Sequence, residues 1–220
     1  MKRIYSVFAC IVISSVVQAQ VGKGAIIIGG NIAYQDQRSD NPSATYLTHD
    51  LNINPSIGKA IRTNLVLGID LSYSHSISDY MNAGEPNDTQ AGNSFYGGVF
   101  LRRYKLLGNG FYLFGQAEAG INYGHTSTDY PLNVPPSSDK TNSYGIQLLL
   151  YPGIAYAINQ HWQIETGLPN FFAVHYNHSS ETAVVTGQSS QESKSHSLYI
   201  SSSLGGTNAF TVGVRYFIGG

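Results

Sequence analysis

The sequence is poor in charged residues, in cysteine and in long apolar runs. Only 11% of its 220 residues are charged, well below the roughly 25% of an ordinary soluble domain. The single cysteine, Cys10, lies near the N-terminus, and no later stretch is continuously apolar for the roughly 20 residues that a membrane-spanning helix needs. After residue 20 the sequence therefore excludes disulfides, thiol chemistry and helical membrane spans.

Positive charge is also scarce. Lys and Arg number 12 against 13 Asp and Glu, and the loss of Lys2 and Arg3 with a leader would leave 10 basic residues. The sequence has no basic run, no Gly-rich phosphate loop and no paired cysteines. We therefore expect no nucleic-acid partner, no cofactor and no metal site built on a known motif.

The N-terminal segment has the features of a secretory signal peptide. Lys2 and Arg3 precede an apolar stretch from Ile4 to Val17, and small residues occupy the cleavage positions before and at Ala19. We expect residues 1–19 to be removed and residues 20–220 to form one domain. A helical anchor is the alternative, but serines interrupt a run that is shorter than a span requires.

The remaining chain shows the two-residue period of β-strands. In residues 64–76, Leu67, Ile69 and Leu71 alternate with Gly68 and Asp70. Similar patterning predicts eight strands, at 24–35, 46–58, 64–76, 94–105, 111–124, 143–157, 161–175 and 197–218. Apolar residues on one face of nearly every strand, with 16 Tyr and 24 Gly, are typical of an all-β, eight-stranded antiparallel up-and-down transmembrane barrel. Composition alone leaves a secreted soluble β-sandwich as the alternative.

The predicted connections alternate in length. They are short at 59–63, 106–110 and 157–160, whereas those at 36–45, 77–93, 126–142 and 176–196 are long and polar. Bacterial outer-membrane barrels have short periplasmic turns and long outer loops, so an even strand count places both termini in the periplasm. Pro55 and Pro152 each precede a short turn and should interrupt strand pairing there. The four long loops are candidate contacts for an extracellular protein, a glycan or lipopolysaccharide.

The interior is predicted to hold most of the strand charges. Five charged residues face inward by strand parity: Asp70, Arg102, Glu118, Glu165 and Arg215. Eight strands enclose a space that side chains fill, and charges at membrane depth are tolerated when they face inward and pair. We therefore expect an ionic network that closes the barrel, with a gated small-ion path as the alternative. In residues 94–105, Val99 and Leu101 are expected to face outward.

Two sets of residues suggest chemistry at the outer rim. Six histidines fall at or near predicted outer strand ends: His49, His75, His125, His175, His178 and His196. Imidazole binds Zn or Cu and gains charge below about pH 6.5, although histidine also suits the headgroup level. The stretch from His175 to Glu181 has the residue types of a serine hydrolase. Adjacent strand residues point to opposite faces, however, and the His-x-Ser-Asn arrangement of lipid A deacylases is missing, so we expect no enzyme.

Several segments resemble a known family. They are Ile53–Gly58 followed by Leu65–Gly68, then Gly98–Tyr104, Tyr151–Tyr156 and Gly213–Phe217. These segments are similar to the small outer-membrane β-barrel family related to OmpX and the OmpA membrane domain, in the form common in Bacteroidetes-type bacteria.

The resemblance implies a porin-like protein of the Gram-negative cell envelope, in contact with outer-membrane lipid and lipopolysaccharide. It also implies recognition of the last strand by the barrel-assembly machinery. The residues of this assembly signal would be Thr211, Gly213, Val214, Tyr216 and Ile218. The expected function is structural or surface-binding, and the alternatives are a narrow ion or solute pore and a lipid-modifying enzyme.

Overall fold

The computed structural model describes residues 21–40, 44–82, 88–130, 137–168, 171–202 and 211–219. The predicted signal peptide, residues 1–19, lies outside these ranges. Every regular element within them is a β-strand, and no helix there is long and apolar enough to cross a membrane. The ten strands are β1 (Ile26–Asp40), β2 (Ala44–Arg62), β3 (Leu65–Asn82), β4 (Asp88–Gly108), β5 (Phe111–Tyr130), β6 (Ser137–Ala157), β7 (Trp162–Gly167), β8 (Phe172–Val185), β9 (Gln191–Ser201) and β10 (Thr211–Ile218).

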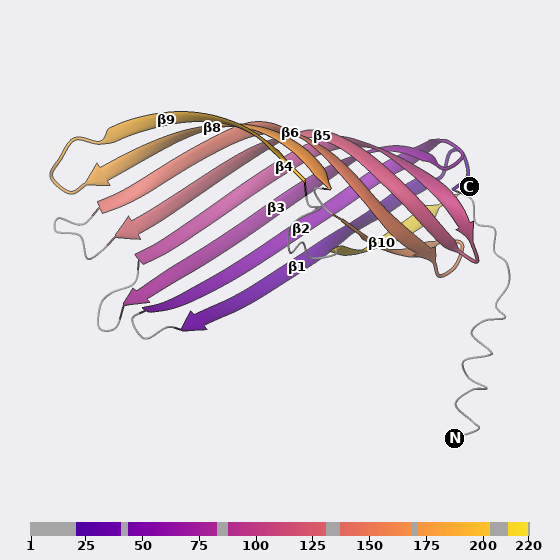
Figure 1. Ribbon diagram of the computed structural model, residues 1–220, viewed down its shortest axis with the longest axis horizontal. Helices are drawn as coiled ribbons and strands as arrows, with labels where there is room; N and C mark the ends of the chain where they lie inside the picture. The colour runs from indigo at the N-terminus through magenta and orange to yellow at the C-terminus, as the bar shows by residue number, and fades with distance from the viewer. Residues whose placement is uncertain are drawn as a thin grey trace, which may run out of the picture.

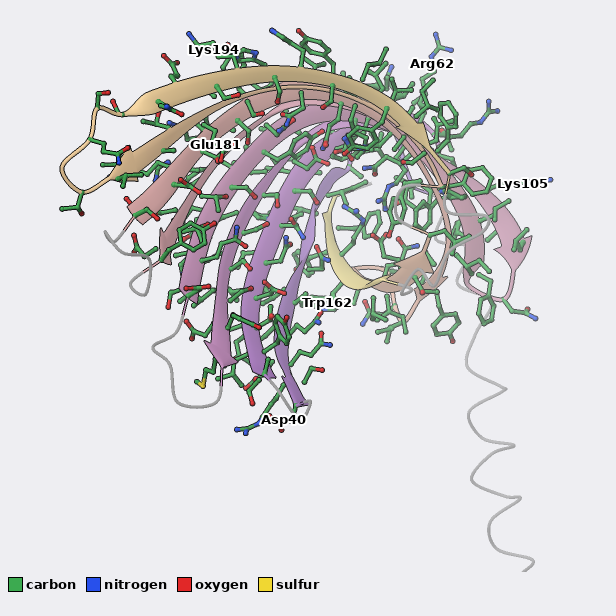
Figure 2. The ribbon with its side chains drawn as sticks, turned by 60° about the vertical axis from the view of Figure 1, so that its left-hand side comes forward. Asp40, Arg62, Lys105, Trp162, Glu181 and Lys194 are labelled. Carbon is green, nitrogen blue, oxygen red and sulfur yellow. The ribbon has the colours of Figure 1, made fainter. Side chains whose placement is uncertain are left out.

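All ten strands belong to one antiparallel sheet that closes into a ring at one end. Strands β1 to β6 pair in chain order, β6 pairs with β7, β7 with β10, and β10 with β1. The yellow arrow of β10, on the right of Figure 1, lies at this closed end. Toward the other end β6 pairs with β8 and β8 with β9. In the described residues β9 has no second neighbour and β1 pairs only with β2 beyond Gly30, so the sheet opens between β1 and β9 (Figure 2).

The strand count differs from the eight that the sequence predicts. The predicted strand at 161–175 is divided into β7 and β8, and the predicted strand at 197–218 into β9 and β10. Pro152 marks the first division, because β6 changes partner between the pairs Leu150 with Phe172 and Gly153 with Gly167. Proline has no N–H to donate to a neighbouring strand, and the change of partner falls beside it.

The expected long outer loops are mostly strand. Strands β1 and β2 extend to Asp40 and from Ala44, and the next three hairpins extend in the same way into the polar stretches. Ser, Thr and Asn side chains form cross-strand hydrogen bonds there, such as Thr48 with Ser78 at 3.4 Å and Ser179 with Ser195 at 2.7 Å. Polar cross-strand pairs stabilise a sheet without apolar burial. The prediction of loops was wrong because it equated polarity with turns.

The short turns lie near their predicted places but begin later, because β2 runs to Arg62 and β4 to Gly108. Asn64 and Asn109 have positive φ angles of 61° and 50°, a conformation that asparagine tolerates better than most residues. Asn64 also accepts a hydrogen bond at Oδ1 from the Val21 amide at 3.1 Å and donates its own amide to the Val21 carbonyl at 2.9 Å. These bonds fasten Val21 to the closed end of the ring.

Apolar side chains fill the closed end from inside. The buried set includes Ile27, Val66, Phe100, Tyr104, Tyr112 and Phe114. The rings of Tyr104 and Tyr112 meet edge to face with centroids 6.1 Å apart, a favoured aromatic geometry. The closed end is therefore a packed core, on which the polar interior rests.

Candidate functional site

An ionic cluster of Arg102, Glu165 and Arg215 lies directly on the apolar core. Arg102 Nη1 is 2.5 Å and Arg215 Nε is 2.8 Å from the same Glu165 oxygen, Oε2. The three side chains come from β4, β7 and β10, and the Arg102 side chain is only 1% exposed. Two cations on one carboxylate leave a local excess of positive charge, which the surrounding polar and aromatic groups must stabilise.

Those surrounding groups come from three further contacts. Arg102 Nε donates to Gln116 Oε1 at 2.8 Å, and its guanidinium carbon lies 4.3 Å from the centre of the Phe114 ring. Arg215 Nη1 donates to Ser56 Oγ at 3.0 Å. Buried cations in proteins are stable when they are paired and hydrogen-bonded, and contact with an aromatic face adds to this. The cluster therefore ties β2, β4, β5, β7 and β10 together across the ring.

The other two predicted network residues, Asp70 and Glu118, also face inward but take a different place. Within the described part of the chain neither forms a salt bridge, and Glu118 Oε2 instead accepts from Gln116 Nε2 at 2.9 Å. Both line a polar cavity of about 450 Å³ next to the ionic cluster. The structure thus brings Arg102, Glu165 and Arg215 into contact and leaves Asp70 and Glu118 on the cavity wall.

Most of the residues that line the cavity are polar. Its wall includes Asn31, Asn52, Asn54, Gln147 and His175 in addition to the two carboxylates. Tyr96 also lines it and lies against Gly98 and Gly120, where an added Cβ would come within 2.1 and 2.3 Å of the Tyr96 hydroxyl oxygen. Glycine at these two positions makes room for the ring. The cavity can hold water or a small polar solute next to the apolar core of the closed end.

The outward face of β5 and β6 is apolar and is bounded by two cross-strand pairs of aromatic residues, here called aromatic rungs. Phe111 pairs with Tyr156 near the closed end, and Tyr123 pairs with Tyr144 twelve residues along β5. The outward side chains between them are apolar or glycine and include Ile121 and Leu148, which are 67% and 52% exposed. A large exposed apolar surface of this kind marks contact with lipid or with another apolar partner. Val99 and Leu101 lie on the same face, as the sequence predicts.

The closing strand β10 has the predicted alternation. Val212, Val214 and Ile218 are exposed on the outer face, while Arg215 is buried on the inner one. Thr211 pairs with Gly167, and Tyr216 pairs with Trp162 of β7 and with Ile28 of β1. Gly213 packs beside Glu165, since an added Cβ would lie 3.3 Å from Glu165 Cγ. The strand therefore closes the ring between β1 and β7.

The six predicted rim histidines do not form one site. His175 lines the interior cavity. By register, the other five lie on the outward face of the sheet: His49, His75, His125, His178 and His196. His49 Nδ1 is 3.5 Å from Asp36 Oδ1. Only His178 and His196 contact each other, with Nδ1 atoms 3.1 Å apart. No group of three His, Cys, Asp or Glu suited to a metal occurs in the residues that the structure describes.

The stretch with the residue types of a serine hydrolase is spread over both faces of β8. Ser179 Oγ bonds to Ser195 Oγ at 2.7 Å, and Ser180 Oγ donates to Glu192 Oε1 at 2.9 Å. Each hydroxyl thus contacts a residue of β9. Among the described residues, neither serine is hydrogen-bonded to a histidine, the contact that a nucleophile and its base require.

At the tip of β1 the charged side chains pair in solvent. Arg38 Nε lies 2.9 Å from Asp40 Oδ2, and Thr45 Oγ1 donates to Asp40 Oδ1 at 2.8 Å. The hydrogen bond from Arg38, followed by that from Thr45, holds the pKa of the Asp40 carboxyl below its ordinary value. Exposed pairs of this kind contribute little to stability.

Comparison with known proteins places the fold. No family model matches the sequence, and no curated protein matches it. The outer membrane protein OprG from Pseudomonas aeruginosa is similar in structure, with a TM-score of 0.54 and 13% identity over 91% of this chain and 98% of OprG. The chain has the fold of an outer-membrane β-barrel protein. A major outer membrane protein from Thermus thermophilus is similar at a TM-score of 0.41 and 12% identity, over 89% of this chain and 98% of that one.

Proposed function

We propose that the chain is an integral outer-membrane protein whose closed end faces the periplasm and whose outer hairpins carry a structural or surface-binding role. The distance between the aromatic rungs of β5 and β6 is the observation that carries this proposal. Twelve residues separate Phe111 from Tyr123 on β5, which is roughly 40 Å of strand at about 3.3 Å per residue. At a tilt of about 45° this is roughly 28 Å, close to the apolar band of about 25 Å in known barrels.

The placement of charge supports the same proposal. The buried ion pairs lie on the inner face, while the stripe between the rungs on β5 and β6 has no charged residue. A soluble sheet would gain nothing from leaving Ile121 and Leu148 exposed. Exposing these apolar side chains to water is unfavourable, and contact with lipid hydrocarbon removes this unfavourable exposure.

The membrane proposal is tested by placing a lysine in the apolar stripe. Leu148→Lys should destabilise the protein in lipid vesicles by about 2–4 kcal/mol, the cost of a lysine at the midplane of a barrel. Thr182→Lys is the matched control, because Thr182 has the same outward parity but lies on the polar part of β8. Urea unfolding of both variants in vesicles measures the difference. Equal stability of the two variants would contradict a lipid-facing stripe.

The closed interior argues for a structural or binding role over transport. The ionic cluster and the aromatic core close the ring where β1, β7 and β10 meet. We expect no stable single-channel steps in planar bilayers, and discrete steps in the purified protein would refute the closed interior. The polar cavity of about 450 Å³ keeps a narrow small-ion pore as the second candidate, which the same recording decides.

The proposed partners are lipid and lipopolysaccharide at the belt, the barrel-assembly machinery at β10, and an extracellular protein or glycan at the hairpins. The likeness to OmpX-type barrels is part of this proposal. We propose no enzymatic activity, and an unchanged lipid A mass profile in cells with and without the protein is the expected result. Shortening each outer hairpin and measuring adhesion and serum survival would locate the binding surface.

A further inference from the structure

Three hairpins repeat one outward-facing arrangement. Each carries a Tyr-x-His sequence on its first strand: Tyr73 with His75 on β3, Tyr123 with His125 on β5, and Tyr176 with His178 on β8. The residue directly opposite the histidine on the returning strand is Asn93, Asn142 and His196 respectively. The three sites are thus equivalent in register and differ in the residue that faces the histidine.

In the first two hairpins the asparagine satisfies both of its neighbours. Asn93 Oδ1 lies 2.9 Å from Tyr73 Oη and 2.9 Å from His75 Nδ1. Asn142 Oδ1 lies 3.2 Å from Tyr123 Oη and 2.8 Å from His125 Nδ1. An amide oxygen has two lone pairs and accepts both hydrogen bonds. In these hairpins the histidine Nδ1 therefore donates to the amide oxygen, and it is occupied.

The third hairpin cannot be satisfied in the same way. His196 Nδ1 lies 3.0 Å from Tyr176 Oη and 3.1 Å from His178 Nδ1. A ring nitrogen has a single lone pair, so it accepts from only one of two donors. Three atoms that can each offer a lone pair therefore converge at one point: two imidazole nitrogens and one phenol oxygen.

We propose that His178 and His196 form a binding site for Zn²⁺ or a similar divalent transition metal on the outer face of the β8–β9 hairpin. Two nitrogens bound tetrahedrally to Zn²⁺ at about 2.0–2.1 Å lie roughly 3.3–3.4 Å apart, and the observed 3.1 Å needs only a small adjustment. Tyr176 Oη and water complete the coordination. Imidazole nitrogen is a preferred ligand of Zn²⁺, Cu²⁺ and Ni²⁺.

The surroundings of the pair suit a metal ion. The site lies where the apolar residues Leu198 and Ile200 of β9 give way to the polar end of the strand, and the His196 side chain is exposed. Lys194 is the next outward residue on β9, and its label in Figure 2 marks this end of the hairpin. Its ammonium is held 3.1 Å from Glu192 Oε1, so its charge is compensated beside the site.

The equivalent hairpins supply matched controls. His196→Asn gives the third hairpin the arrangement of the first two, and Asn142→His gives the second the arrangement of the third. The protein is purified in detergent without a polyhistidine tag, stripped of metal and titrated with ZnCl₂ by calorimetry. The variant with both His178→Asn and His196→Asn measures binding by the five other histidines. Its binding heat is subtracted as the background.

We expect one Zn²⁺ site in the original protein beyond that background. Losing even an outer partner of a metal ligand costs about 10–100-fold in affinity, so His196→Asn and His178→Asn should each weaken binding at least about tenfold. Asn142→His should raise the stoichiometry from one to two. The proposal is overturned if the original protein binds no more Zn²⁺ than the double variant, or if His196→Asn binds as tightly as the original.

Discussion

Glu165 holds together the interior of the closed end, and its replacement by glutamine is the most direct test of that arrangement. The carboxylate is 6% exposed and pairs at Oε2 with Arg102 at 2.5 Å and with Arg215 at 2.8 Å. Glu165→Gln keeps the side-chain shape and removes the only salt-bridge partner that either arginine has in the described residues. Leaving an uncompensated charge buried costs about 3–5 kcal/mol. We expect a loss of that size in the free energy of unfolding.

The loss can be measured as a shift of the urea midpoint in detergent or lipid vesicles. With a denaturant slope of about 1–3 kcal/mol/M, a loss of about 3–5 kcal/mol lowers the midpoint by roughly 1–5 M. Glu192→Gln is the control, because Glu192 also pairs with a cation, Lys194, but both side chains are more than half exposed. The control should barely move the midpoint. If Glu165→Gln were as stable as Glu192→Gln, the ionic cluster would not stabilise the closed end.

Further predictions concern packing and charge away from that cluster. Gly120→Ala should cost about 1–3 kcal/mol, as overpacking does, because its Cβ would lie 2.3 Å from the Tyr96 hydroxyl oxygen; Gly115→Ala has open space and should cost nothing in the same unfolding assay. At the tip of β1, Arg38→Gln should raise the pKa of Asp40 toward its ordinary value by more than Thr45→Val does, because the Arg38 hydrogen bond is the largest cause of the lowered pKa. The Asp40 charge is present at neutral pH and is lost as the pH falls through that lowered pKa, so its interaction weakens only in acid. Carboxyl NMR titration measures both shifts, and an equal pKa in all three proteins would contradict the pairing.

Sequence patterning predicts the outward face of the strands well, and physical reasons explain why. Successive side chains of a strand point to opposite faces whichever strand it pairs with. Val99, Leu101 and Val214 therefore lie on the face that the alternation predicts. The turns at Asn64 and Asn109 are also local, since they depend on the backbone preference of one residue. Parity likewise places Asp70 and Glu165 on the same inner face.

Partner choice and contact geometry were not predictable in this way. The alternation of side chains tells which face of the sheet a residue is on but not its position along the barrel axis. It therefore does not predict that Glu165 forms salt bridges with both Arg102 and Arg215 while Asp70 forms none with either. The change of β6 from β8 to β7 beside Pro152 depends on long-range pairing. The Tyr-x-His repeat was visible in the sequence, but its meaning rests on register, which sets Asn142 and His196 opposite their histidines.

The two ends of the sheet are held by different forces, and this difference bears on where the protein can act. At the closed end, aromatic burial, ion pairs and hydrogen bonds join strands that are far apart in sequence. Arg102 and Glu165 pair between β4 and β7, and Arg215 donates to Ser56 between β10 and β2. At the open end, β9 is held by backbone pairing with β8 and by exposed contacts such as Ser179 with Ser195. Regions with few buried contacts open first, so amides of β9 should exchange with solvent sooner than those of β4 and β5. Slow exchange throughout β9 would contradict this order. A hairpin that opens easily reshapes around a ligand at little cost, which favours the outer hairpins over the interior as the binding surface.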